Sequence, residues 1–232
     1  TVVSPFYPYA RQDKKHKGRE PISARLISDL YKTAGADRLM CVDLHTSQIQ
    51  GFFDGPLDHL FAIPVLAKHI RERVEDLSNV TVVSPDTGRV RVAEHWADLL
   101  DGAPLAFVHK TRDINVPNHA VSKTVVGDIE GRTCVLIDDM IDTGGTIAGA
   151  VKVLMDKGAK EVIIAATHPV LSDPAAERLS QCGAVEVIVT NTLPVPEEKQ
   201  FDNLTILSIA PLIARAIREV FDEGSVTEIF DH

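Results

Sequence analysis

The sequence contains few cysteines and no long apolar run. Cys41, Cys134 and Cys182 are spaced like neither a zinc site nor a disulfide framework, so we expect buried free thiols in a reducing cytoplasm. No run approaches the roughly 18 apolar residues of a membrane-spanning helix, which predicts no membrane segment. No signal peptide, low-complexity segment or long linker is recognisable, although a chain that starts at Thr1 is compatible with the loss of a leader.

Basic residues are fewer than acidic ones. The 232 residues include 24 Lys and Arg against 33 Asp and Glu, which gives a formal net charge of −9. Such a balance does not favour binding to nucleic acid or to an anionic membrane, so we expect neither partner. A content of 44% hydrophobic and 25% charged residues is typical of a globular chain with a substantial core.

Short apolar runs rich in Val and Ile recur along the chain and predict buried strands. They are continuous rather than alternating, as in parallel sheets that are covered on both faces. The runs are Thr1–Ser4, Leu39–Val42, Val80–Ser84, Leu105–His109, Thr133–Ile137, Glu161–Ala166 and Val185–Thr190. Amphipathic stretches with helical spacing lie between most of them. We therefore predict an α/β fold.

Two of the stretches with helical spacing resemble each other. Their apolar positions and terminal glycines are Ile22, Leu26 and Leu30 before Gly35, and Ile147, Val151 and Leu154 before Gly158. In both, a predicted strand follows and leads to a histidine, and the pentamer TVVSP also occurs twice. These echoes predict two related domains, residues 1–58 and 59–232, with a seam in Gly51–Pro64 and a C-terminal end that is free to pack back on the first domain.

The segment Thr133–Gly149 combines a buried strand, paired carboxylates and a glycine turn before a helix. Gly144 and Gly145 allow a tight turn and the close approach of a ligand. Amides at a helix N-terminus suit an anion, and ligands of open α/β sheets bind past the carboxyl ends of strands. The candidate ligand-binding residues are Asp138, Asp139, Asp142, Thr143, Gly144, Gly145 and Thr146.

The paired carboxylates need a separate explanation, because acids repel a phosphate. Asp138 and Asp139 suit sugar hydroxyls, or waters on a divalent cation that bridges to phosphate. The alternative is a capped connection between a strand and a helix, with solvated aspartates.

Two cationic clusters interrupt the acidic background. Residues 11–19 hold five Lys and Arg plus His16 after a tight turn, which favours a polyphosphate or adenine-nucleotide site over a solvated loop. Lys110 and Arg112 follow a predicted strand and point to one side of an extended chain, as needed to bracket a phosphoryl group. A solvent-exposed loop is again the alternative, and Ile114–Ser122 is predicted to be one.

Histidines also end two predicted strands. Asp43 and His45 lie two residues apart and thus on one face, although a lone strand-end histidine is more often a hydrogen-bonded core residue. His168 is predicted to be such a structural residue. Trp96 and the stripe Ile209–Phe221 are predicted to lie in the core or in an interface.

These motifs resemble the ribose-phosphate pyrophosphokinase family in its actinobacterial form. Besides the glycine turn, the resemblance is carried by FYPYARQDKKHKGREPIS, DLHTSQIQGFF, VVSPDTG, HKTRD and ATHPVLS, and it covers nearly the whole chain. It implies two related type I phosphoribosyltransferase-like domains with central parallel sheets. Family chains begin well before the strand at Thr1, so the resemblance implies that the first domain is incomplete.

The resemblance also implies a reaction and the residues that perform it. ATP would transfer its diphosphoryl group to the anomeric hydroxyl of ribose 5-phosphate, with Mg²⁺, giving 5-phosphoribosyl 1-diphosphate and AMP for nucleotide biosynthesis. The implied assignments are Arg11 and Gln12 for ATP, Asp43, His45 and Asp86 for the metal, Lys110 and Arg112 for catalysis, and Arg112, Asp138, Asp139 and Asp142–Thr146 for ribose 5-phosphate. Thr111 departs from the Arg that many members carry. Family members are cytoplasmic and form hexamers built from dimers.

Two other functions remain open at this point. A phosphoribosyltransferase that consumes the diphosphate shares the Thr-Gly-Gly-Thr turn but is expected to lack ARQDKK and the loop around Lys110. A non-catalytic binding subunit is expected to lose Lys110 or that loop. A chain without the preceding segment is also compatible with ribose phosphate binding in the absence of catalysis.

Overall fold

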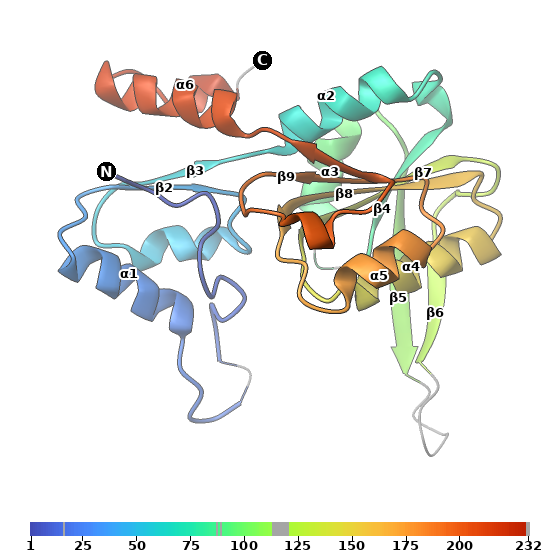
Figure 1. Ribbon diagram of the computed structural model, residues 1–232, viewed down its shortest axis with the longest axis horizontal. Helices are drawn as coiled ribbons and strands as arrows, with labels where there is room; N and C mark the ends of the chain where they lie inside the picture. Colours follow the sequence, from blue (N-terminus) through green and yellow to red (C-terminus); the bar gives the residue numbers. More distant parts are fainter. Residues whose placement is uncertain (16, 87, 89, 113–120, 231–232) are drawn as a thin grey trace. The chain divides into compact units, whose positions relative to one another are not determined.

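The computed structural model describes residues 1–232 except 16, 87, 89, 113–120 and 231–232 (Figure 1). The chain divides into two compact units, Thr1–Ala62 with Ser208–His232, and Ile63–Leu207. The division after Ala62 falls within the seam expected at Gly51–Pro64, and the C-terminal residues cluster with the first unit. The domain limits 1–58 and 59–232 stay a prediction.

The first unit contains a three-stranded parallel sheet in the order β1-β2-β3. Its strands are β1 Val2–Val3, β2 Leu39–Val42 and β3 Leu57–Leu60, and its helices are α1 Ser23–Thr33, η1 Ser47–Phe52, α6 Ala210–Phe221 and η5 Thr227–Ile229. Strand β3 lies in the expected seam and was not predicted. The strand does not form an apolar run, because Asp58 and His59 occupy its centre. Asp58 accepts a hydrogen bond from Arg38 at 2.8 Å.

Helix α1 forms where its spacing predicts, but it buries a different face. Leu26 and Leu30 are 54% and 55% exposed, whereas Ala24 and Ser28 are buried. Ser28 belongs to the core side because its hydroxyl lies 2.6 Å from the buried phenol oxygen of Tyr7. The buried face of this helix therefore contains a hydrogen bond as well as apolar contacts.

The second unit contains a seven-stranded sheet in the order β10-β9-β8-β7-β4-β5-β6. Its strands are β4 Val80–Ser84, β5 Leu105–Arg112, β6 Val121–Val126, β7 Thr133–Ile141, β8 Glu161–Pro169, β9 Glu186–Thr190 and β10 Leu204–Leu207. Its helices are α2 Ile63–Arg73, η2 Leu77–Asn79, α3 Val90–Leu99, α4 Gly145–Asp156, α5 Ala175–Gln181 and η4 Glu197–Lys199. Every strand pair is parallel except β5 with β6. The predicted α/β class is thus confirmed.

The core of the second unit lies on both sides of strand β7. Helices α4 and α5 cover one face of the sheet, and α2 and α3 cover the other (Figure 1). Helix α4 buries Ile147, Val151 and Leu154, and the chain leaves it through Gly158 at a φ of 89°, as its spacing predicts. The strand between these layers is almost entirely buried, which explains why its sequence is continuously apolar.

The antiparallel strand β6 and the edge strand β10 were not predicted. Val121 and Ser122 belong to β6, which pairs with β5, and not to the loop expected at Ile114–Ser122. The rest of that expected loop falls on residues 113–120, outside the described residues. Both strands lie at sheet edges, where polar residues such as Lys123 and Thr205 interrupt the apolar pattern.

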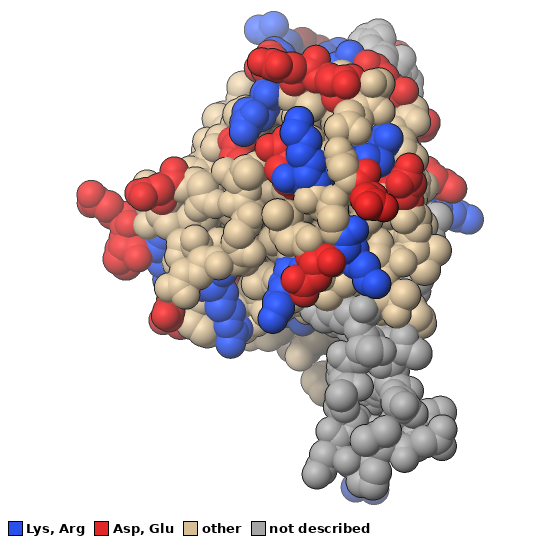
Figure 2. Space-filling view, turned by 90° about the vertical axis from the view of Figure 1, so that its right-hand side faces the viewer, with Lys and Arg blue, Asp and Glu red and all other residues tan. Residues whose placement is uncertain are grey.

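The cysteines and the aromatic residues agree only partly with the predictions of burial. The three cysteines are free, with Cys41 and Cys134 buried and Cys182 only half-buried. Trp96 is a core residue at 2% exposure, whereas Phe221 at the end of α6 is 85% exposed. Acidic and basic side chains are interspersed on the face shown in Figure 2. Among the described residues, no helix is both long and apolar enough to cross a membrane.

We expect Leu136→Ala to lower the free energy of unfolding by about 2–5 kcal/mol, because Leu136 is fully buried in β7 and its loss leaves a cavity. The control Met155→Ala, on α4 at 41% exposure, is expected to cost less than about 1 kcal/mol. Denaturant unfolding of both variants measures the difference, and equal losses would contradict the position of the core.

Candidate active site

The predicted glycine turn forms directly after β7. Gly144 has a φ of 71° and is the N-cap of α4, which begins at Gly145. This left-handed conformation is costly for residues with a Cβ atom. A Cβ on Gly144 would also lie 3.5 Å from both Ala175 and Leu179 of α5. Gly144 itself is buried, whereas Thr143, Gly145 and Thr146 are exposed, so the turn presents its outer backbone and hydroxyls to solvent.

The N-terminus of α4 favours an anion. Because its N-cap is glycine, no side chain at that position can accept from the first helical amides. Such amides, together with the helix dipole, are the usual partners of a phosphate at the end of a strand. The arrangement therefore has the geometry that phosphate binding requires.

The two carboxylates before the turn differ in exposure. Asp139 is 7% exposed, whereas Asp138 is half-buried and accepts a hydrogen bond from the Asp139 amide at 2.9 Å. Asp142, which is half-buried as well, begins the turn itself. Strand β7 continues to Ile141, so both acids lie within the strand rather than after it.

A residue that the sequence did not single out supports the turn. Arg178 of α5 donates a hydrogen bond from Nη1 to the carbonyl of Thr143 at 3.0 Å. The same nitrogen lies 3.5 Å from the position of a Cβ on Gly145. Arg178 carries no local signal, because the contact joins positions that are 35 residues apart and depends on how α5 packs against α4.

Three of the predicted site segments lie at the carboxyl ends of neighbouring strands in the large sheet. Strand β4 lies between β5 and β7 and is parallel to both, so the carboxyl ends of all three point the same way. Asp86 follows β4, Lys110 and Arg112 end β5, and Asp138 and Asp139 lie near the end of β7. The side chains of Lys110 and Arg112 are outside the described residues.

Asp86 is exposed and takes part in a tight turn. Its Oδ1 accepts a hydrogen bond from the amide of Gly88 at 2.8 Å, and its carbonyl accepts from the hydroxyl of Ser84 at 2.7 Å. These contacts hold the residue at the end of β4 with its carboxylate at the surface.

The other predicted site residues, Arg11, Gln12, Asp43 and His45, belong to the first unit. Two hydrogen bonds to Ala24, one before and one after Arg11, anchor the segment that carries Arg11 and Gln12. The phenol of Tyr7 donates to the carbonyl of Ala24 at 2.8 Å, and the amide of Ala24 donates to the carbonyl of Gln12 at 3.2 Å. Burial raises the pKa of Tyr7, which keeps this donor protonated. Arg11 and Gln12 are exposed, so the anchored segment offers both side chains to solvent.

Asp43 directly follows β2 and has a strained backbone conformation. Its φ is 40°, in the left-handed region, and its Oδ2 accepts from the amide of Ala62 at 3.1 Å. The next amide, of Leu44, donates to Nε2 of His59 at 2.9 Å, so this ring nitrogen carries no proton. These contacts fix the backbone directly before His45, which is half-buried.

His168 is a structural residue, as predicted. It is 1% exposed, and its Nδ1 lies 2.9 Å from the hydroxyl of Thr192. Thr190 and Thr192 in turn bond to the carbonyl of Thr167. Within the described part of the chain, no group of three or more His, Cys, Asp and Glu residues is suited to hold a metal ion.

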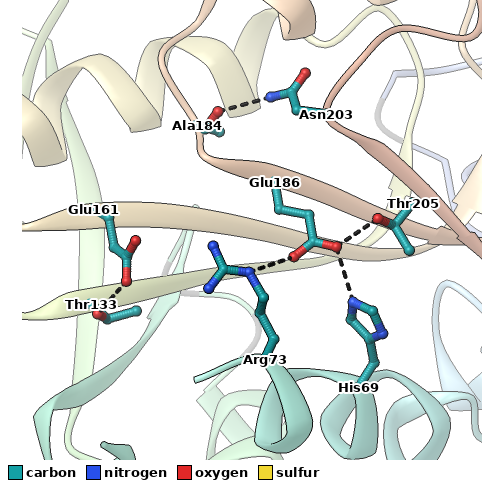
Figure 3. Close-up of polar contacts among 8 residues, drawn as sticks. All are labelled: His69, Arg73, Thr133, Glu161, Ala184, Glu186, Asn203 and Thr205. Atoms are coloured by element: carbon teal, nitrogen blue, oxygen red, sulfur yellow. Dashed lines mark hydrogen bonds and ion pairs between the residues drawn. The ribbon is translucent and has the colours of Figure 1, made fainter. Parts of the chain in front are cut away.

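A polar cluster lies at the amino ends of the strands (Figure 3), whereas the candidate site follows their carboxyl ends. Glu186, at the start of β9, accepts from Thr205 at 2.6 Å and lies 2.9 Å from Nε2 of His69. Arg73 approaches its other oxygen at 3.5 Å. Thr133 and Glu161, which begin β7 and β8, form a further hydrogen bond of 2.8 Å. The contacts of Glu186 join helix α2 and strand β10 to β9, so this cluster holds a helix and an edge strand on the sheet.

A mostly parallel α/β sheet with acidic residues and a glycine turn at the carboxyl end of a central strand is typical of α/β proteins that bind a phosphorylated ligand. Comparisons with known proteins narrow this class. The family described as phosphoribosyl synthetase-associated domain matches residues 99–231, and the N-terminal domain of ribose phosphate pyrophosphokinase matches residues 1–35. The chain belongs to the ribose-phosphate pyrophosphokinase family, as its motifs predict.

Individual relatives support this assignment. The chain is 70% identical over 231 residues to ribose-phosphate pyrophosphokinase of Mycobacterium tuberculosis, covering 100% of this chain and 71% of the relative. It is 66% identical over 232 residues to the Bifidobacterium longum protein of that name, of which it covers 68%. The crystal structure of phosphoribosylpyrophosphate synthetase from Mycobacterium smegmatis aligns with a TM-score of 0.89 and 66% identity, over 96% of this chain and 71% of that one.

We expect Cys41 and Cys134 to be inert toward a thiol reagent at pH 8 until the protein unfolds. Burial raises the pKa of both thiols to about 12 from an ordinary value of 9.0, so both stay protonated. Above pH 9.0 the unfolded thiols ionise while the folded ones keep their protons, so the free energy of unfolding falls as the pH rises toward 12.

Titration with a chromogenic disulfide reagent measures this difference. Half-buried Cys182 is expected to react first, and full reaction of all three thiols is expected only in denaturant. Rapid reaction of Cys41 in the folded protein would contradict its burial in β2.

Proposed function

We propose that this protein is a ribose-phosphate diphosphokinase, which transfers the diphosphoryl group of ATP to the anomeric hydroxyl of ribose 5-phosphate. The products are 5-phosphoribosyl 1-diphosphate, a precursor for nucleotide biosynthesis, and AMP. One observation carries the proposal: the glycine turn of Gly144 follows β7 at the same sheet edge as Lys110 and Arg112, in a chain of this family.

Ribose 5-phosphate is assigned to the turn after β7. The amides of Gly145 and Thr146 and the hydroxyls of Thr143 and Thr146 would hold the 5-phosphate at the N-terminus of α4. Asp138 and Asp139 would accept hydrogen bonds from the ribose hydroxyls, which removes the conflict between carboxylates and a phosphate ligand. Asp142 would fix the start of the turn, and Arg178 supports this assignment by holding the carbonyl of Thr143.

The family resemblance implies that Arg11 and Gln12 bind ATP, and that Asp43, His45 and Asp86 are the residues that serve a divalent cation. Carboxylate oxygens are the ligands that Mg²⁺ prefers, and Asp86 is exposed, so the chemistry of each carboxylate suits the ion. A single histidine is less usual for Mg²⁺ and is consistent with a contact through water. The cation, when bound, would neutralise charge on the phosphates of ATP.

Positioning and electrostatics would perform the chemistry. Attack of the anomeric oxygen on the β-phosphorus forms one P–O bond and breaks the bond from the β-phosphorus to the bridging oxygen. AMP leaves with that oxygen, and the anomeric hydroxyl gives up its proton to solvent. The fixed cations Lys110 and Arg112 would stabilise the charge that develops on the transferred group. Little covalent work is left to the protein, because phosphoryl transfer depends mainly on positioning and on the stabilisation of charge.

The proposal extends to the oligomeric state of the enzyme and to its cellular compartment. The family resemblance favours a hexamer built from dimers, and sedimentation of the purified protein tests it. We place the enzyme in the cytoplasm because both substrates are charged metabolites of that compartment.

The function is tested by incubating the purified protein with ATP, ribose 5-phosphate and Mg²⁺ and separating the nucleotides. We expect AMP to appear only when both substrates are present. ADP as the nucleotide product would contradict diphosphoryl transfer. Tight ribose 5-phosphate binding without AMP would instead favour a non-catalytic binding subunit.

Lys110→Ala is expected to lower kcat by a factor of about 10²–10³, because it removes a cation from the transferring group. The KM for ribose 5-phosphate should stay within about threefold, since Lys110 is not assigned to ground-state binding. Lys152→Ala, at an exposed position of α4, is the matched control and should leave both constants unchanged. An unaltered kcat for Lys110→Ala would remove this residue from the mechanism.

Gly144→Ala is expected to weaken ribose 5-phosphate binding at least tenfold, because a Cβ in a left-handed residue distorts the turn. Gly102→Ala is a close control: its φ is 74° against 71° for Gly144, and a Cβ there meets nothing within 4 Å. Both variants should lose comparable stability from the backbone alone. Calorimetry should detect lost affinity only in Gly144→Ala, and equal affinities would count against the turn as the phosphate site.

A further inference from the structure

Asp13 is a buried carboxylate inside an exposed cationic segment. It is 4% exposed, whereas Arg11, Gln12, Lys14 and Lys15 around it are all exposed. A buried charge is costly unless hydrogen bonds or ion pairs compensate for the lost hydration. The burial of Asp13 therefore needs an explanation.

The partners of Asp13 come from a distant segment. Its Oδ2 accepts hydrogen bonds from the hydroxyl of Thr46 at 2.6 Å and from the side-chain amide of Gln48 at 2.8 Å. These donors lie 33 and 35 residues further along the chain, at the start of η1. Both are neutral and offset the desolvation of a carboxylate less fully than a cation would.

The contact joins two segments that are otherwise anchored to different elements. The carbonyl of Gln12 is held by α1 through Ala24, and the amide of Asp43 donates to Leu60 of β3. Asp13 directly follows Gln12, and Thr46 directly follows His45. The side-chain bond between Asp13 and Thr46 therefore links the proposed ATP segment to the proposed metal segment, one residue away from each.

We propose that Asp13 is a positioning residue for the metal–nucleotide complex. It holds the segment of Arg11 and Gln12 at a fixed distance from Asp43 and His45, so that one ATP molecule with its cation can engage both. The inference rests on the proposed function, and it adds a residue that touches neither substrate. Asp13 acts through the segments that it joins.

A double-mutant cycle tests this role in steady-state kinetics. We expect Asp13→Ala to raise the KM for Mg–ATP roughly tenfold, with the KM for ribose 5-phosphate within about twofold. Thr46→Val should change the KM for Mg–ATP in the same direction. The double variant should be little worse than Asp13→Ala, because both substitutions break the same bond.

Two further variants separate positioning from a purely structural role. Asp13→Asn keeps an oxygen that can accept from both Thr46 and Gln48, so it should restore most of the affinity for Mg–ATP. Asp29→Ala is the matched control, because Asp29 is an exposed carboxylate of α1 that pairs with Arg25 in the same unit. It should leave both KM values unchanged.

Hydrogen exchange provides a readout that does not depend on activity. In Asp13→Ala, amides of residues 11–13 and of residues 46–48 should exchange faster together. Faster exchange confined to residues 11–13, or a KM for Mg–ATP equal to that of the wild type, would overturn the proposal. Wild-type protein that forms no AMP would defeat the proposed function instead, and the exchange pattern would still decide whether Asp13 joins the two segments.

Discussion

The parallel pairing of β4 with β5 and β7 is the constraint on which the proposed ribose 5-phosphate site depends. Parallel strands bring their carboxyl ends to one edge, so residues that are far apart in sequence, such as Asp86 and Asp138, reach the same side of the sheet. The left-handed Gly144 then turns the chain into α4 at that edge. Without this topology, the acids, cations and helix amides would remain separate features of an acidic chain.

The two ends of the strands in the large sheet carry different groups. Stabilising contacts lie at the amino ends, and the proposed site lies at the carboxyl ends. At the amino ends, Glu186 gathers partners from α2 and β10, and these bonds fix a helix and an edge strand to the sheet. At the carboxyl ends, the chain forms a left-handed glycine turn and carries acids that are buried or half-buried, and the burial of these acids costs stability. Buried polar groups have a comparable division of labour in the first unit, where Tyr7 orients α1 while Asp13 joins two exposed segments.

Much of the architecture could be predicted from local pattern. Leu39–Val42 and Val80–Ser84 are strands with the expected bounds, and α4 has the expected buried residues, because continuous apolar runs and helical spacing follow directly from burial. Strands β3, β6 and β10 and the buried face of α1 could not, since polar residues and the Tyr7–Ser28 bond override that pattern. The glycine turn could be predicted from its own residues. The contacts of Arg178 and Asp13 could not, because they join positions 35 and 33 residues apart and exist only in the folded chain.

The central claim is that a diphosphoryl group moves as one unit onto the sugar held at the Gly144 turn. Phosphorus NMR of a reaction with ATP, ribose 5-phosphate and Mg²⁺ tests it most directly. We predict that the ATP signals are replaced by those of AMP and of a coupled diphosphate pair attached to the anomeric carbon. Signals of ADP with a single new phosphate on the sugar would contradict the account.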